Sequence, residues 1–274
     1  MNILGDLTIN GTLSMTARGA KAKGKYVGIS KLASVVCYNE TNIFNNNFTV
    51  IPPTTSGIPV QPAPFYGTNG VNGTDGGCGS GGTGGRQTRV ASGNGTALAG
   101  LGAAGSSFSG GPGGGGLNVW SLSAPTAAKS GEANGGKGGD SLAYNNDNSY
   151  PRYTGGGAGN PGGSVVTTGG LGGGSKGSDG TGGLLILFVK GDIIFGPTGA
   201  IVSHGSNGGA AIGGKWGSGG GGSGGGAIHI LHRGIITDST KVTATGGLGG
   251  IGKGSEGGSS GGKGGDGTVN IVQL

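Results

Sequence analysis

Glycine recurs at every third position in two stretches of this chain. The first stretch runs from Gly67 to Gly85, and the second runs from Gly246 to Gly267, where only Ser255 interrupts the phase. A period of three fits neither an α-helix nor a β-strand, but it is the period of a polyproline-II-type helix, which has no internal hydrogen bonds. Glycine along one edge lets two such helices approach until their backbones bond sideways. The phase therefore predicts polyglycine-II helices packed side by side.

The amino-acid composition limits the alternatives to packed polyglycine-II helices. The chain has 77 glycines but only 10 prolines among its 274 residues. Collagen needs abundant proline and the glycine period along the whole chain, so it is excluded. Glycine without a period is typical of disorder, because such a chain has little apolar surface to bury. The period and the apolar segments beside it favour order. A flexible linker over the middle of the chain is the alternative.

Three segments of the chain resemble one another: residues 5–19, 191–205 and 234–246. The first alternates apolar and polar residues, which is typical of half-buried strands around a turn. Apolar strands at 184–189 and 227–231 precede the later copies, glycine tracts follow them, and a last strand at 268–272 closes the chain. The repeating unit is thus a strand, a short hairpin and a returning glycine helix. We expect the three apolar strands to form one sheet with Leu7 to Met15.

The predicted fold is mostly β and polyglycine-II, with short β-hairpin repeats joined to a stack of extended glycine-rich helices and almost no α-helix. Four segments follow along the chain. They are an N-terminal β-hairpin unit (1–19), an insertion that is a candidate attachment region (20–66), a glycine-rich stack with exposed loops (67–183), and two strand–hairpin–glycine repeats with the closing strand (184–274).

Aromatic, amide and guanidinium side chains gather in two of the expected loops, 117–130 and 142–154. Aromatic rings stack on the apolar face of sugars while amides bond their hydroxyls, and the same rings anchor protein interfaces. For Trp120 the alternative is a plug at the end of a core that lacks large side chains. The predicted receptor-binding residues are Trp120, Tyr144, Asn146, Tyr150, Arg152 and Tyr153.

Much of the basic excess in a net charge of +6 lies in one patch: Arg18, Lys21, Lys23, Lys25 and Lys31. Such a patch suits phosphate-bearing polymers such as lipopolysaccharide, teichoic acid or nucleic acid. A solvated loop or an attachment surface is the favoured interpretation, and we expect no nucleic-acid partner.

The residues that enzymes and cofactors need are missing or badly spaced. His229 and His232 are three apart on one strand and point to opposite faces, so they cannot share a metal ion. Most carboxylates stand singly in glycine tracts, where a desolvated catalytic pair is hard to build. The sequence therefore predicts a protein that is not an enzyme, with no catalytic residue, no metal and no cofactor.

No apolar run approaches the roughly 20 residues that span a bilayer, and the N-terminus lacks the features of a signal peptide. We therefore expect no membrane span, and a protein made in the cytoplasm of a host cell and kept there or released by lysis.

Glycine tracts alternating with short dissimilar segments over residues 67–183 resemble the receptor-binding adhesins at the tail-fibre tips of T-even-like bacteriophages. In that family the glycine motifs form layered polyglycine-II helices, and the loops between them select a bacterial surface protein or sugar. The end repeats, such as residues 5–13, are more similar to glycine-rich structural proteins of phage tails and capsids.

The resemblance implies a non-enzymatic virion protein, an adhesin at a tail or fibre tip that recognises a surface glycan or outer-layer protein of a bacterium. The alternative is a structural fibre, decoration or tail subunit without a receptor role. Other virion proteins are expected partners, and a homotrimer is expected because fibre-like proteins gain rigidity from parallel chains and because strand edges need cover.

Overall fold

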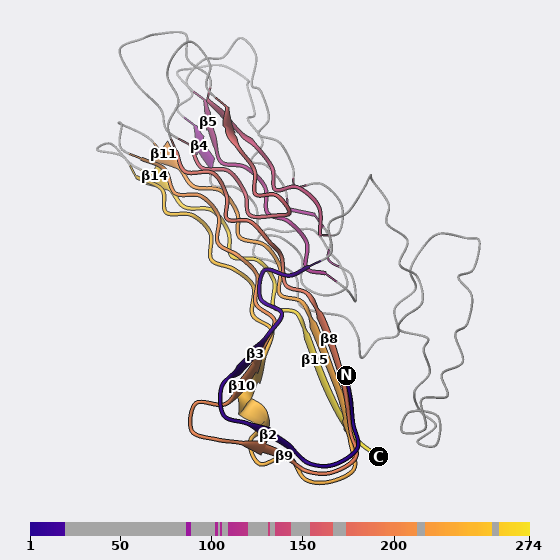
Figure 1. The fold of residues 1–274 in the computed structure, drawn as a ribbon. Helices are drawn as coiled ribbons and strands as arrows, with labels where there is room; N and C mark the ends of the chain where they lie inside the picture. The colour runs from indigo at the N-terminus through magenta and orange to yellow at the C-terminus, as the bar shows by residue number, and fades with distance from the viewer. Residues whose placement is uncertain are drawn as a thin grey trace, which may run out of the picture.

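The computed structural model describes residues 1–19, 86–88, 102–103, 105, 109–119, 131, 135–143, 154–166, 174–212, 217–253 and 258–274. Helix in these residues is limited to one short 3-10 turn, η3 (Ser239–Lys241). Strands and extended tracts make up the rest, so the expectation of a mostly β protein with almost no α-helix is confirmed for the described chain. Figure 1 shows two parts, a triangular base and a bundle of extended tracts that rises from it.

The triangular base, which we call the prism, has three sides of parallel strands. The first side carries β1, β8, β12 and β15 in that order, the second carries β2 and β9, and the third carries β13, β10 and β3. Their bounds are β1 (Asn2–Ile3), β2 (Leu7–Ile9), β3 (Thr12–Ser14), β8 (Leu184–Val189), β9 (Ile193–Phe195), β10 (Ala200–Val202), β12 (Ala227–His232), β13 (Val242–Thr243) and β15 (Thr268–Gln273).

The three apolar strands form one sheet, as predicted, but the predicted hairpins are wrong. Strands β2 and β3 do not pair with each other; Leu7 lies beside Ile193, and Leu13 lies beside Ile201, in parallel register. The N-terminal strand in the main sheet is β1 rather than Leu7 to Met15. A period-two pattern shows that one face is buried, but it does not decide whether a strand pairs with its neighbour in sequence or with the matching strand of another copy.

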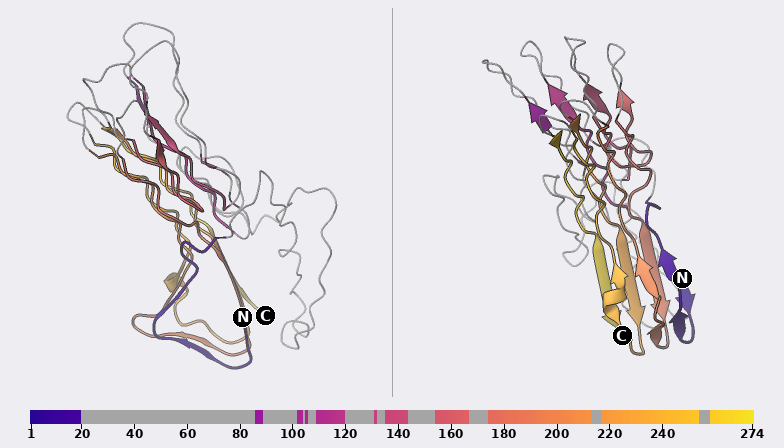
Figure 2. Two further views of the ribbon diagram at one scale, coloured as in Figure 1. Left: turned by 45° about the horizontal axis from the view of Figure 1, so that its top comes forward. Right: turned by 90° about the vertical axis from the view of Figure 1, so that its left-hand side faces the viewer.

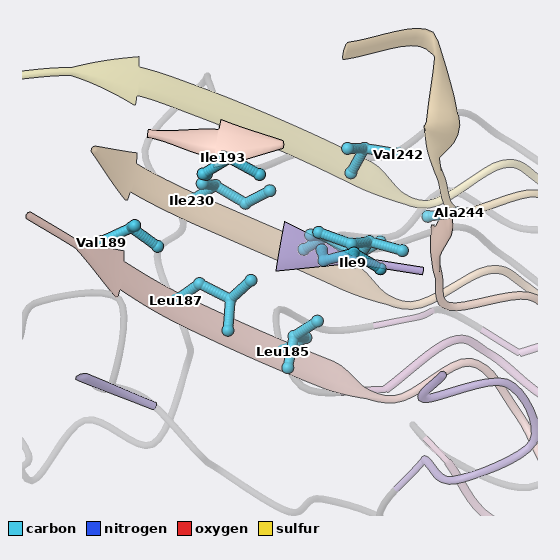
Figure 3. Close-up of a cluster of buried hydrophobic side chains, with 10 residues drawn as sticks. Ile9, Leu185, Leu187, Val189, Ile193, Ile230, Val242 and Ala244 are labelled. Atoms are coloured by element: carbon cyan, nitrogen blue, oxygen red, sulfur yellow. The ribbon is translucent and has the colours of Figure 1, made fainter. Parts of the chain in front are cut away.

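Inward side chains from all three sides fill the prism. Leu187, Ile193, Ile201 and Ile230 are fully buried. Figure 3 shows the cluster between the strands, which is built from Ile9, Leu185, Leu187, Val189, Ile193, Ile201, Ile228, Ile230, Val242 and Ala244. The three similar sequence segments thus stack as successive layers around one apolar core.

Side chains at the corners of the prism link one layer to the next. Asp6 Oδ1 accepts a hydrogen bond from the backbone N–H of Asp192 at 2.8 Å, and Asp192 Oδ1 accepts one from Ile235 at 2.8 Å. At another corner, Thr16 Oγ1 accepts from His204 N–H, and His204 Nδ1 accepts from Thr245 N–H, both at 3.0 Å. Side chains at matching positions of the repeats therefore accept hydrogen bonds from backbone N–H groups at the corners, between the paired strands.

Extended tracts form the second part of the molecule, which we call the glycine stack. The tracts are 109–116, 135–140, 154–163, 174–183, 205–212, 217–226, 244–253 and 258–267, and they lie side by side in both views of Figure 2. Tracts 217–226 and 258–267 lead directly into β12 and β15. The stack and the prism are therefore one continuous structure.

Backbone hydrogen bonds in the glycine stack rotate among three neighbours with a period of three. In tract 217–226, the N–H groups of Gly219, Gly222 and Gly225 donate to the carbonyls of Ser259, Gly262 and Gly265. Those of Gly220, Ser223 and Gly226 donate to Gly209, Ser206 and Ser203, and those of Gly221 and Gly224 donate to Gly114 and Gly111. The first neighbour therefore runs parallel to this tract and the other two run antiparallel to it.

Close backbone approach explains the glycine phase near the C-terminus. A Cβ atom added at Gly249 would lie 1.9 Å from the carbonyl oxygen of Gly261, and one at Gly264 would lie 2.0 Å from that of Ser223. Leu248 and Ile251, which are out of this phase, are instead 61% exposed. The phase therefore marks one edge where tracts touch, and Gly247 and Gly250, in another phase, lie on a second edge with equally close contacts. The earlier run, from Gly67 to Gly85, lies outside the described residues.

Candidate recognition end

Short strands gather at the end of the glycine stack that lies away from the prism (Figures 1 and 2). Four of them form a parallel sheet in the order β4 (Arg86–Thr88), β5 (Leu117–Val119), β6 (Ser141–Ala143) and β7 (Val165–Val166), and β11 (Gly217–Ser218) pairs with β14 (Gly258–Ser259). We call this end the recognition end, because both predicted recognition loops adjoin it.

The two predicted loops begin on neighbouring strands. Strand β5 ends directly before Trp120, and β6 ends directly before Tyr144; Leu117 lies beside Leu142 and Asn118 beside Ala143 in parallel register. The predicted side chains themselves, Trp120, Tyr144, Asn146, Tyr150, Arg152 and Tyr153, all lie outside the described residues. The structure thus brings together the chain positions from which the loops start, and the binding set stays a prediction.

Hydrogen bonds close the base of loop 142–154. The buried Ser141 donates from Oγ to the carbonyl of Thr154 at 3.3 Å, so the two ends of the loop are held together. Gly116, just before β5, donates to the carbonyl of Gly155 at 2.8 Å, and Gly155 donates to Ser218 at 2.8 Å. The bases of both loops and the start of β11 are therefore tied to one another through backbone groups.

A Lys-Gly-x-Asp motif occurs three times in the stack and forms the same ion pair each time. Lysine Nζ lies 2.7, 3.0 and 2.8 Å from the aspartate three residues later, and each aspartate also accepts a backbone N–H, from Ser164, Gly162 and Gly246 in turn. The pairs are Lys137–Asp140, Lys176–Asp179 and Lys263–Asp266. A period of three puts both side chains on one edge. The sequence carries this signal in the spacing of each lysine and aspartate, which a count of single carboxylates overlooks.

The surroundings of Asp266 favour its charged form. Burial by itself raises the pKa of Asp266, but the hydrogen bonds from Lys263 and from the Gly246 N–H outweigh it, and the pKa is lowered overall. Each of the three aspartates pairs with a lysine and accepts a backbone N–H from a neighbouring tract. The lowered pKa of Asp266 is the opposite of what a catalytic acid needs, since the pKa of such an acid must be raised.

Two histidines in the prism have lowered pKa values. Burial lowers the pKa of His229 to about 4, and it lowers that of His204 against the opposing pull of Asp266. His232 Nδ1 lies 2.8 Å from the carbonyl oxygen of Gly234. Over the described residues, no group of three histidine, cysteine or acidic side chains is placed to hold a metal ion.

The predicted basic patch is represented in the structure by one residue. Arg18 is exposed where the prism meets the stack, and the neighbouring Gly19 donates to the carbonyl of Thr181 at 2.8 Å. Lys21, Lys23, Lys25 and Lys31 lie outside the described residues. Of the predicted patch, the structure thus places only Arg18, at the junction of the prism and the stack.

Two further segments adjoin the recognition end along the chain. Strand β11 begins directly after residue 216, and β14 begins directly after residue 257. Segments 213–216, with Lys215 and Trp216, and 254–257 themselves lie outside the described residues. The repeat carries a signal for them, because a glycine tract that leaves and re-enters the prism must reverse at the far end, but the predicted binding residues do not include Trp216.

Comparisons with known proteins give no assignment. No family model matches the chain, and neither a curated protein nor a solved structure is significantly similar to it. Among the described residues, no helix has the length and apolar character needed to cross a bilayer.

Proposed function

We propose that this chain is a non-enzymatic bacteriophage virion protein, an adhesin that presents recognition loops on a stack of polyglycine-II helices. The rotation of backbone hydrogen bonds with a period of three supports the polyglycine-II assignment, because a helix with three residues per turn directs successive N–H groups to three different neighbours. The loops would recognise a surface glycan or an outer-layer protein of a bacterium.

The observation that carries the proposal is the common origin of the loops. Segments 120–130 and 144–153 leave from hydrogen-bonded neighbours, β5 and β6, at the end away from the prism. Binding sites built on a rigid scaffold hold their residues better than sites on isolated loops. The hydrogen bonds of Ser141 and Gly116 at the loop bases provide such a scaffold.

The division of the molecule supports a role for the prism as a base. The aromatic loops adjoin the far end of the stack, whereas both chain ends lie on the prism (Figure 1). Contacts with other virion proteins would then be made by the prism or by the basic patch that begins at Arg18. Cell binding and virion attachment would thus use opposite ends of the protein.

The test is binding of the purified, fluorescently labelled protein to cells of the bacterium that the virus infects. The double variant Trp120→Ala, Tyr150→Ala should bind at least about thirtyfold more weakly, since removing an anchoring ring commonly costs 2 kcal/mol or more. Ile235→Ala is the matched control, because Ile235 is an exposed apolar residue on the prism. Its binding and the thermal stability of both variants should equal those of the wild type.

Unchanged cell binding in the double variant would contradict the adhesin proposal. Antibody labelling of intact particles then decides on the alternative, a structural subunit. A signal at the tail or fibre tip is expected of an adhesin, and a signal along the tail or over the capsid is expected of a fibre or decoration subunit.

A further inference from the structure

Strand β15 is the edge of the largest sheet in the prism, and nothing in its sequence protects that edge. Its residues, Thr-Val-Asn-Ile-Val-Gln, include no charge and no proline, the usual devices that keep edge strands from pairing. Other strands at the edges of the prism's sheets are shorter. For example, β1 and β13 have two residues each. Strand β15 therefore offers the longest outer edge of the described prism.

Strand β15 carries apolar residues on both faces, together with the polar Thr268 and Asn270 on its outer face. Val269 and Ile271 lie beside Ile228 and Ile230, which point into the core. On the other face, Val272 and Leu274 pack against the outer cluster formed by Phe188 and Leu231. Val269 is nevertheless 39% exposed, so apolar surface beside the core is left open at this edge.

The backbone of β15 also has groups that point outward. Thr268 N–H donates to Gly226 at 2.9 Å, and Leu274 N–H donates to His232 at 2.8 Å, so the even-numbered residues face β12. Because the hydrogen-bonding direction alternates along a strand, the N–H and C=O groups of Val269, Ile271 and Gln273 point away from β12.

We propose that β15 pairs antiparallel with β15 of a second copy, around a twofold axis at Ile271. This register sets Ile271 against Ile271 and Val269 against Gln273 on the core side, and Asn270 against Val272 on the outer side. No charged residue meets a like charge, and both apolar clusters continue into the partner. A twofold axis makes one surface complementary to itself, so no second sequence is needed.

The side-chain hydrogen bonds at the corners of the prism favour a dimer over an open-ended stack of copies. Asp6 and Asp192 each offer a carboxylate to the next layer, but the third copy has Ile235 at this position and offers none. A second copy that added a full layer on all three sides of the prism would lack this corner hydrogen bond. The pairing is therefore confined to the side of the prism that carries β15. The pairing does not depend on the receptor role, and it replaces the homotrimer as our proposal for the oligomer.

The test is the mass of the full-length protein in solution, measured by light scattering across a concentration series. The wild type should have twice the monomer mass at tens of micromolar. Val269→Lys should raise the dissociation constant at least tenfold, because it puts a charge into the pair. Ile194→Lys is the matched control, since Ile194 is a similarly exposed residue (37%) on β9, and it should leave the dimer intact.

Further variants keep the test decisive. Gln273→Pro removes an outward N–H, so it should also weaken the dimer if Val269→Lys fails to fold. Gln273→Ala is its control, because it loses only the side-chain bonds to the carbonyls of Arg233 and Gly234 and should leave the dimer intact. Leu248→Ser combined with Ile251→Ser removes the exposed apolar residues of the glycine stack and should have no effect on the mass. A wild-type monomer or trimer, or a dimer lost only in the Leu248 and Ile251 variant, would overturn the proposal.

Discussion

The prism and the glycine stack use opposite solutions to the same problem of filling an interior. In the prism, large side chains such as Leu187 and Ile230 fill the space between three sheets. In the stack, a Cβ atom added at most of the described glycines would lie within about 3 Å of the backbone of a neighbouring tract, and backbone hydrogen bonds hold the tracts together. Only small side chains such as those of Ala158 and Ser223 are buried between these contacts. The prism is thus sensitive to a loss of side-chain volume, and the glycine contacts of the stack are sensitive to a gain.

The strongest test of this comparison is to add one methyl group to the stack. In Gly220→Ala, the new Cβ would lie 2.0 Å from the carbonyl oxygen of Gly156 and 2.3 Å from its carbon, both backbone atoms of a neighbouring tract. We expect destabilisation by about 4 kcal/mol or more, or failure to fold. Gly11→Ala, with no atom within 4 Å of its Cβ, is the control. Equal urea midpoints for the two variants would contradict the packing described.

The converse change removes volume from the prism. Leu187→Ala should lower the free energy of unfolding by about 3 kcal/mol, because Leu187 is fully buried and leaves a cavity among the sheets. The exposed Leu4→Ala should change it by less than about 0.5 kcal/mol. Chemical denaturation monitored by circular dichroism measures both. A loss below about 1 kcal/mol for Leu187→Ala would mean that the prism is not a packed core.

Acid should destabilise the prism in particular, because His229 lies there. The folded pKa of His229, about 4, lies below its ordinary 6.5, so the unfolded chain binds the proton more readily, and stability falls as the pH drops through this window. The expected loss is about 2 kcal/mol between pH 7.5 and pH 5. His204 adds a contribution of the same sign. His229→Gln should flatten the stability profile; an unchanged slope would be inconsistent with a buried neutral imidazole.

The smallest effects concern the ion pairs of the stack. Asp140 is buried and its carboxylate bonds both Lys137 and the Ser164 N–H, so Asp140→Asn should cost about 2 kcal/mol. Lys176 and Asp179 are both 60% exposed, and Lys176→Ala should cost no more than about 0.5 kcal/mol. Thermal unfolding of the two variants gives the ranking, and the reverse order would refute the role of burial in these pairs.

The two regions also differ in how far the sequence predicts them. The glycine phase predicted close approach of tracts at Gly249 and Gly264, because only one residue type permits it. The apolar runs predicted the sheet of β8, β12 and β15. Parallel stacking of β2 on β9 was not predicted, since Leu7 and Ile9 would be buried equally well in a hairpin.

The candidate site was predictable only as a set of loops. Aromatic content singled out Trp120 and Tyr150, but which loops adjoin one another depends on long-range pairing between β5 and β6. Segment 213–216 is not predicted for the same reason, because only the position of β11, which follows it in the chain, links it to the recognition end. Residue types predict the chemistry of a surface, and topology decides which segments share it.

Hydrogen exchange of individual backbone amides tests most directly whether the glycine stack is a folded scaffold. Gly220, Gly222 and Gly250 donate to neighbouring tracts, so their protection should lie within about tenfold of that of Leu187 and Ile230 in the prism. Protected amides in both regions would support a rigid stack that presents loops at its far end. Exchange of the glycine amides at the rate of an unstructured chain, with the prism still protected, would contradict it.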